Sequence, residues 1–297
     1  MILAVDVGNS NIKVGMYRDG VWQRRFRIQT VAERTPDEYT LLFSHFLGRL
    51  ETEPDDISKA VISSVVPPVT SNLAEMIVEL TGITPLIVGP GTRTGLRIRA
   101  DNPAEVGADL VANGVAAYER YKSSCIVVAF GTALTFTALQ EPGDLVGVSI
   151  APGLNHAAET LFRSTAQLRL VDLTPPAEFM GKNTIHSIQS GIVHGYVGLT
   201  EHLISGISRE LRQAETREHK RKPGAAENAA SRSSAGAAEN ASSRSTSGAA
   251  EENGRLETVP VIATGDQARV LLPLTEKITD YDPWLTLEGL RIIAGRN

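Results

Sequence analysis

Hydrophobic and polar positions along the chain predict strands and helices that are interspersed, as in an α/β fold. The first run, 2–7, is apolar except for Asp6, and apolar residues then recur at every second position over 12–16. A tight-turn signal at 18–20 precedes a further strand over 21–28. The pattern therefore predicts three antiparallel strands at the start of the chain.

Helices are expected where proline follows a capping residue, at Thr35-Pro36 and again at Asn102-Pro103. The second start has Glu105 at the third helical position, as in a capping box, and predicts one helix from Pro103 through Tyr121. The other predicted elements are strands over 59–66, 85–88, 125–130, 134–139 and 259–263, and helices over 69–80, up to about Arg212, over 267–272 and from 283 onward.

Two stretches repeat each other in register: AVDVGNSNIKVGM over 4–16 and VVAFGTALTFTAL over 127–139. Each reads as a strand, a glycine, a short hydroxyl-bearing loop and a second strand. Such a repeat predicts two similar lobes that face each other across a cleft, with the loops at 8–11 and 131–133 presenting backbone N–H groups to a shared ligand. The alternative is two unrelated glycine hairpins.

The repeat suggests a lobe over 1–100 and a second over 101–297, which contains a low-complexity insertion. Residues 224–254 repeat Gly, Ala, Ser, Glu and Asn with a 12-residue period and no large apolar side chain. We predict a disordered insertion over about 214–257, because such a composition cannot offset its ordering entropy by burial. We expect its deletion to leave folding and dimerisation intact, unless the repeat is a recognition segment for another protein.

Composition adds constraints on partners and compartment. The 297 residues are 42% hydrophobic and 21% charged, and the net charge of −5 gives no general attraction to nucleic acid or membrane. The single cysteine, Cys125, precedes an apolar run and reads as a buried inert thiol. Polar residues interrupt the N-terminus and no apolar run approaches the ~20 residues of a membrane span, so we expect a cytoplasmic protein.

The run DVGNSNIK at 6–13 carries the strongest candidate chemistry. It matches neither a Walker loop nor a dinucleotide fingerprint. It offers a carboxylate at a strand end, exposed amides in a tight turn, side-chain donors and Lys13, a set that suits nucleotide phosphates. A bridging Mg²⁺ would relieve the cost of placing Asp6 beside negative oxygens.

Here the chain resembles the type III pantothenate kinases. The resemblance rests on DVGNSNIKVG (6–15), PAEVGAD (103–109), FGTALTF (130–136), IAPGL (150–154), GKNTIHSIQSG (181–191), VIATGD (261–266) and DPWLTLEGL (282–290). It implies two ribonuclease-H-like lobes of the actin, sugar-kinase and Hsp70 superfamily, with mixed sheets flanked by helices. It also implies ATP-dependent phosphorylation of pantothenate to 4′-phosphopantothenate, the first step of coenzyme A biosynthesis, in a homodimer that binds substrate partly at its interface.

Carried onto this sequence, the resemblance assigns roles to particular residues. Asp109 becomes the catalytic base, and Asp6 places the Mg²⁺ through the phosphates. Read from the sequence alone, Asp109 could equally be a surface residue near a helix N-terminus. The ATP contacts become Asp6, Val7, Gly8, Asn9, Ser10, Asn11, Ile12, Lys13 and Thr132, and the pantothenate contacts Gly107, Ala108, Asp109, Leu110 and Thr184.

The chain departs from the family pattern at several of these positions. Ala129 stands where the family has an aspartate that holds a monovalent cation, K⁺ or NH₄⁺, so that site is expected to be lost. Leu110 replaces an arginine, Asp266 a glycine, and Thr137 an acidic residue. These departures leave an alternative open: a catalytically impaired homologue that acts as a nucleotide-binding or regulatory factor.

Overall fold

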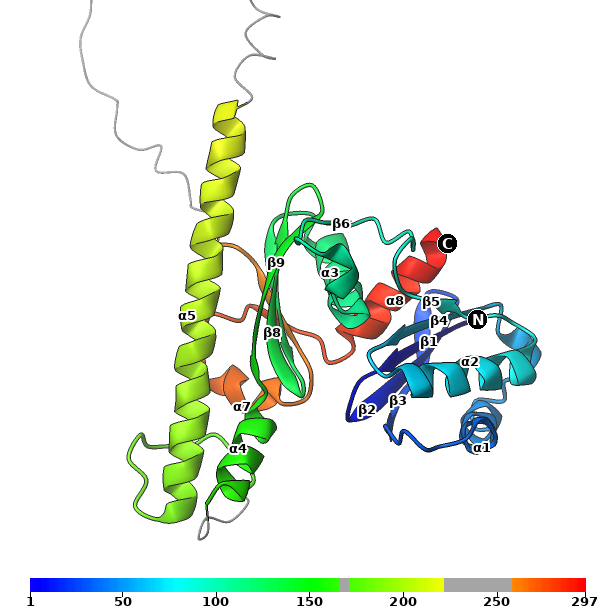
Figure 1. Ribbon diagram of the computed structural model, residues 1–297, viewed down its shortest axis with the longest axis horizontal. Coiled ribbons are helices and arrows are strands. Elements are labelled where there is room, and N and C mark those ends of the chain that lie inside the picture. The colour runs from blue at the N-terminus through cyan, green and yellow to red at the C-terminus, as the bar shows by residue number, and fades with distance from the viewer. Residues whose placement is uncertain (166–170, 222–257) are drawn as a thin grey trace, which may run out of the picture.

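The predicted pair of lobes is present in the computed structural model, which describes residues 1–165, 171–221 and 258–297 (Figure 1). Each lobe is built on one mixed sheet flanked by helices. The first sheet has the order β3-β2-β1-β4-β5 and the second the order β11-β10-β7-β8-β9-β6. Of the disordered insertion predicted over about 214–257, residues 222–257 lie outside the described residues, whereas 214–221 are helical, so its predicted start was wrong.

The first lobe begins with the three antiparallel strands that the alternation predicts. Its strands are β1 (Ile2–Val7), β2 (Asn11–Arg18), β3 (Val21–Gln29), β4 (Lys59–Ser64) and β5 (Leu86–Ile87). Helices α1 (Pro36–Gly48) and α2 (Pro67–Thr81) pack on its outer face through a buried cluster around Tyr39 and Phe43. The Thr35 side chain caps α1 as predicted, since it accepts from the Glu38 N–H while Glu38 accepts from the Thr35 N–H.

The second lobe repeats the hairpin. Its strands are β6 (Arg97–Ile98), β7 (Cys125–Phe130), β8 (Ala133–Gln140), β9 (Asp144–Pro152), β10 (Val261–Thr264) and β11 (Asp280–Tyr281). Helices α4 (Leu154–Arg163), α5 (Thr184–Arg221) and α7 (Ala268–Leu271) lie toward its outer face (Figure 1). Cys125 is fully buried and burial raises the pKa of its thiol to about 12, which confirms the inert reading.

Two helices fill the space between the sheets and so hold the lobes together. Helix α3 (Ala108–Tyr121) contacts β7 and β8, whereas α8 (Leu285–Arg296) contacts β1 and β4. The two helices pack on each other, and at Gly289 a Cβ atom would lie only 1.8 Å from the carbonyl oxygen of Ala112. The approach of the two backbones at this point requires glycine.

We therefore expect Gly289→Ala to destabilise the protein. The added methyl meets backbone rather than a flexible side chain, so the helices must move apart, and overpacking of this kind costs about 3 kcal/mol or more. The measurement is urea unfolding at neutral pH. Gly295→Ala is the matched control on the same helix: nothing lies within 4 Å of its Cβ position, so its stability should be unchanged or slightly higher.

Three sequence predictions about helix limits were wrong. The helix expected from Pro103 is a single 3₁₀ turn over Pro103–Glu105, and α3 starts only after Gly107. Asp109 accordingly lies in the first turn of its helix, not the second. Helix α2 starts at Pro67 rather than Val69, and α5 continues to Arg221, past its expected end near Arg212. Two further 3₁₀ turns span Pro54–Asp56 and Leu272–Leu274.

Candidate active site

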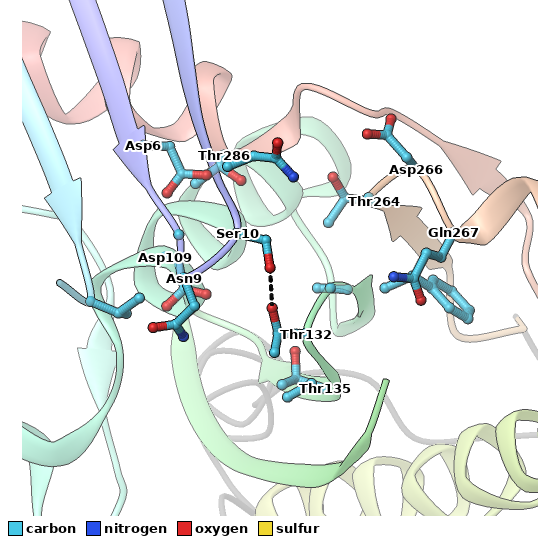
Figure 2. Close-up of a pocket in the computed structure, with 18 of the residues that line it drawn as sticks. Asp6, Asn9, Ser10, Asp109, Thr132, Thr135, Thr264, Asp266, Gln267 and Thr286 are labelled. Carbon is cyan, nitrogen blue, oxygen red and sulfur yellow. Dashed lines mark hydrogen bonds between the residues drawn. The ribbon is translucent and has the colours of Figure 1, made fainter. Parts of the chain in front are cut away.

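A polar pocket of about 540 Å³ lies between the two hairpin loops, as the repeat predicts (Figure 2). Both loops line it, and they touch where the Ser10 and Thr132 hydroxyls share a hydrogen bond of 3.2 Å. In Figure 2 the side chains of Asp6, Asp109 and Thr286 lie at one end, and those of Thr264, Asp266 and Gln267 at the other. The pocket is therefore a shared site of both lobes.

Each loop is closed by its glycine N–H, but the second loop is one residue shorter than the first, so the repeat shifts by one residue in the strand that follows. In the first, the Gly8 N–H donates to the Asn11 carbonyl at 3.1 Å; in the second, the Gly131 N–H donates to the Ala133 carbonyl at 3.0 Å. Each glycine follows a strand that ends at the pocket, and the residues of the turn after it line the cavity. Successive amides in such turns form concave sites for anions. Because both loops line one pocket, the structure favours the predicted pair of facing lobes over two unrelated glycine hairpins.

Asp6 is buried at the end of β1, with its residue only 7% exposed. Burial raises the pKa of its carboxyl to about 6, while Lys13, whose Nζ lies 3.8 Å from Oδ2, acts in the opposite direction. The negative charge of Asp109 adds to the rise, and the Ser63 and Thr286 hydroxyls oppose it. A carboxylate that is costly to ionise by itself is suited to a bound cation.

Asp109 lies partly buried in the first turn of α3 and lines the same pocket. Burial raises the pKa of its carboxyl above the ordinary value, and the Leu110 backbone N–H and Lys13 act in the opposite direction. Gly107 leaves room for this side chain, because a Cβ there would lie 2.6 Å from Asp109 Oδ1. The geometry gives a sheltered carboxylate that can accept a proton from a hydroxyl in the pocket.

Strands of the second lobe form one wall of the pocket, and the residues that they contribute to it are uncharged. Ala129 on β7 pairs with Thr135 on β8 and with Thr264 on β10, and all three line the pocket. The buried hydroxyl oxygens of Thr135 and Thr264 have no hydrogen-bond partner among the described residues. Asp266 follows at the rim, where it pairs with Arg27 of the first lobe at 2.8 Å.

With this geometry established, comparisons with known proteins assign the family. The sequence model of the family described as type III pantothenate kinase matches residues 2–206. The chain is 37% identical to the type III pantothenate kinase of Anaeromyxobacter sp. (strain K), and the alignment covers 100% of both chains. It is also 37% identical to the type III pantothenate kinase of Roseiflexus sp. (strain RS-1), over 100% of this chain and 99% of the other. The chain belongs to the type III pantothenate kinase family.

The fold of this family member, two lobes that are each built on a mixed sheet flanked by helices, is the one that the resemblance implied. Among solved structures, a Campylobacter jejuni protein assigned to the Baf family of transcriptional activators superposes with a TM-score of 0.53 at 14% identity. The match covers 99% of this chain and 98% of that one, and shows the fold alone. Within the described ranges, no helix is long and apolar enough to cross a membrane.

Most residues predicted to contact ATP line the pocket of this pantothenate kinase homologue. They are Asp6, Val7, Gly8, Asn9, Ser10, Asn11, Lys13 and Thr132. Ile12 does not line it: its side chain is fully buried in the core of the first lobe, because β2 turns alternate residues to opposite faces. Lys13, the next residue, therefore faces the pocket.

The residues predicted to contact pantothenate are only partly brought together. Asp109 lines the pocket, whereas Gly107, Ala108 and Leu110 are not among its lining residues, and Leu110 is buried. Thr184 lies elsewhere, exposed at the start of α5, where it borders a separate hollow with Leu161 and Ile188. Within one chain, Thr184 does not reach the other predicted contacts.

Several pocket residues were missed from the sequence. They are Asn113, Thr135, Asn155, His156, Glu159, Thr264, Gln267 and Thr286. A signal existed for Thr264, since it is the one hydroxyl in the otherwise apolar strand β10. Thr286 lies on α8, near the end of the chain, and only the packing of that helix against β1 brings it beside Asp6.

Proposed function

We propose that this protein transfers the γ-phosphoryl group of ATP to the primary hydroxyl of pantothenate, giving 4′-phosphopantothenate for coenzyme A biosynthesis. The observation that carries the proposal is the placement of Asp109 and Asp6 at one end of a pocket whose middle is formed by two amide-bearing turns. Phosphoryl transfer needs positioning, charge neutralisation and a base, and the pocket offers a group for each.

The phosphates of ATP fit the turns at 8–11 and 131–133, where backbone N–H groups and the hydroxyls of Ser10 and Thr132 can donate to them. Lys13 supplies a positive charge at the same end. Asp109 then accepts the proton of the attacking hydroxyl as the new oxygen–phosphorus bond forms and the bond to ADP breaks. Activity should therefore fall as the pH is lowered, because the carboxyls of Asp6 and Asp109 have raised pKa values and become protonated.

A divalent metal fits this end of the pocket. Asp6 and Asp109 place two carboxylates near one lysine, and burial penalises the charged form of both. No group of three or more metal-ligating side chains occurs over 1–165, 171–221 and 258–297, so the ion is expected to enter with the nucleotide rather than bind alone. Bound Mg²⁺ would neutralise phosphate charge, with Asp6 as the residue that holds it.

The direct test is to incubate the purified protein with ATP, Mg²⁺ and pantothenate and to measure 4′-phosphopantothenate by mass spectrometry. Product that depends on both substrates supports the proposal. ATP binding without any product, at enzyme concentrations comparable to substrate, would contradict it. ATP turnover with another small alcohol but not with pantothenate would support a phosphotransferase and show that the proposed acceptor is wrong.

We further propose that the active form is a homodimer. The surface around the start of α5 exposes large apolar side chains: Phe179 is 79% exposed, Met180 82% and Ile185 52%. Thr184, predicted to contact substrate, lies on this surface, so a second copy could bring it to a pocket that one chain leaves without it.

Ile185→Glu is expected to yield a monomer with greatly reduced activity. A glutamate in the first turn is favourable for the helix, so loss of dimer would reflect the interface rather than unfolding. Light scattering coupled to size exclusion measures the mass. Leu41→Glu, on α1 of the other lobe and 74% exposed in the parent, is the control that should remain dimeric. An unchanged mass for Ile185→Glu would place the interface elsewhere.

A further inference from the structure

The two sheets carry matching rows of residues in register, and only some of these residues line the pocket. In the first lobe, strand register aligns Ser63, Asp6, Lys13 and Arg27 across β4, β1, β2 and β3. In the second lobe, the equivalent row is Thr264, Ala129 and Thr135 across β10, β7 and β8. Asp6 and Ala129 occupy equivalent positions, so the first row is charged and the second is neutral.

The neutral row does not fit a monovalent cation. Its oxygens are the Thr135 and Thr264 hydroxyls, both buried and without a partner in the part of the chain that the structure describes. Between them stands the methyl group of Ala129, where the family resemblance implies a carboxylate. Hard cations bind where charged or carbonyl oxygens gather, and two hydroxyls around a methyl group supply no charge.

The positive charge near this wall comes from a side chain of the protein, that of Arg27. The Arg27 guanidinium reaches across the cleft from β3 to Asp266, with 2.8 Å between Nη2 and Oδ1. Its plane lies over the Trp284 ring, 4.2 Å from the centroid, which fixes the group in place. Asp266 lines the pocket two residues after Thr264, at a position where the resemblance gives glycine.

Arg27 does not line the pocket itself, but it pairs with Asp266, which does, and one of its donors has no acceptor. Its Nε is buried and has no hydrogen-bond partner in the described chain. A buried N–H without an acceptor is costly, whereas an oxygen of a bound nucleotide would satisfy it. Asp266 and Arg27 thus place one negative and one positive charge at this wall. The net charge of the pair is zero, the same as that of an aspartate with a bound potassium ion.

We infer that the Arg27–Asp266 pair replaces the exchangeable monovalent cation in this protein, so that Arg27 is a nucleotide-positioning residue and MgATP binding is independent of K⁺ and NH₄⁺. This inference rests on the proposed function, because it assumes that the pocket binds ATP.

The first test is the dissociation constant of MgATP, measured calorimetrically without pantothenate in KCl, NH₄Cl and choline chloride at equal ionic strength. The wild-type values should agree within about twofold, and Arg27→Gln should weaken binding roughly tenfold in every salt, with partial recovery in Arg27→Lys. Arg24→Gln is the matched control, since Arg24 is exposed on the opposite face of the same strand. A large K⁺ requirement of the wild type, or normal binding by Arg27→Gln, would overturn the inference.

The second test needs no nucleotide and therefore separates this inference from the proposed function. Ala129→Asp places a carboxylate between the two free threonine hydroxyls, so its melting temperature should rise in KCl relative to choline chloride, while that of the wild type should not. An equal rise in the wild type would show that it binds the ion, and the inference would fail. Absence of MgATP binding in all salts would instead refute the kinase proposal, and the melting comparison would still decide the cation question.

Discussion

Asp109→Asn is expected to lower kcat for phosphopantothenate formation by about 10²–10⁴-fold, the usual contribution of a general base. Asparagine keeps the shape of the side chain and its place in the first turn of α3, but it cannot accept the proton of the attacking hydroxyl. The affinity for MgATP should change little, because in the proposed binding mode the phosphates lie at the turns 8–11 and 131–133 rather than at α3. The substitution should therefore lower kcat and leave the dissociation constant of MgATP nearly unchanged.

The measurement is single-turnover product formation, with calorimetric MgATP binding in parallel. Glu105→Gln is the control for loss of a carboxylate near the start of α3, because Glu105 lies exposed in the preceding 3₁₀ turn and contacts Asn102. Near-normal turnover by Asp109→Asn would mean that another group accepts the proton, and Asp6 would be the next candidate.

The repeat was the part of the sequence that predicted the fold and most of the site. Apolar runs over 2–7 and 125–130, each followed by a glycine and an alternating stretch, indicated the two strands of each hairpin and the turn between them. Period-2 patterns are read directly from neighbouring residues, so local information was sufficient. Two such hairpins with equivalent loops imply a shared cleft, and Ser10 and Thr132 meet there.

The start of α3 shows where local rules fail. Asn102, Pro103 and Glu105 match a capping box, yet the Asn102 amide donates to the Glu105 carboxylate at 2.7 Å and caps no helix. The chain continues extended through Val106 before Gly107 begins the real helix. The bond between Asn102 and Glu105 is compatible with a single 3₁₀ turn or with the start of a long helix. The start of α3 depends instead on how this helix packs against α8.

Arg27, Thr264 and Thr286 could not be assigned to the site from sequence for another reason. Each lies on a different element, and their relation to the pocket depends on how β3, β10 and α8 are placed around it. Arg27 reads as one of several exposed arginines until its register with Lys13 and its pairing with Asp266 are known. Such residues follow from tertiary structure alone.

Asp6→Asn is expected to abolish most activity and yet make the folded protein more stable at pH 8. The pKa of Asp6 is about 6 in the folded protein and 3.8 in the reference state, because burial disfavours the charged form. The folded protein thus holds this proton more tightly than the unfolded chain, so the free energy of unfolding falls as pH rises from about 4 through about 6. Above that range the full cost of the buried charge is present, on the order of 3 kcal/mol with the attraction to Lys13 already included.

Removing the charge should therefore raise the free energy of unfolding at pH 8, and the gain should be about 1.5 kcal/mol smaller at pH 5, where the wild-type carboxyl is already largely protonated. Urea unfolding of both proteins at the two pH values measures it. Asp56→Asn is a control of opposite sign, because a hydrogen bond from Arg18 lowers the pKa of Asp56, and its loss should destabilise the protein at pH 8. Activity should fall at least about 100-fold in Asp6→Asn, since the Mg²⁺ proposed to bind with the phosphates would lose a carboxylate ligand. A variant that is both inactive and less stable at pH 8 would show that Asp6 stabilises the fold through Lys13, and that its charge is not held at a cost for binding.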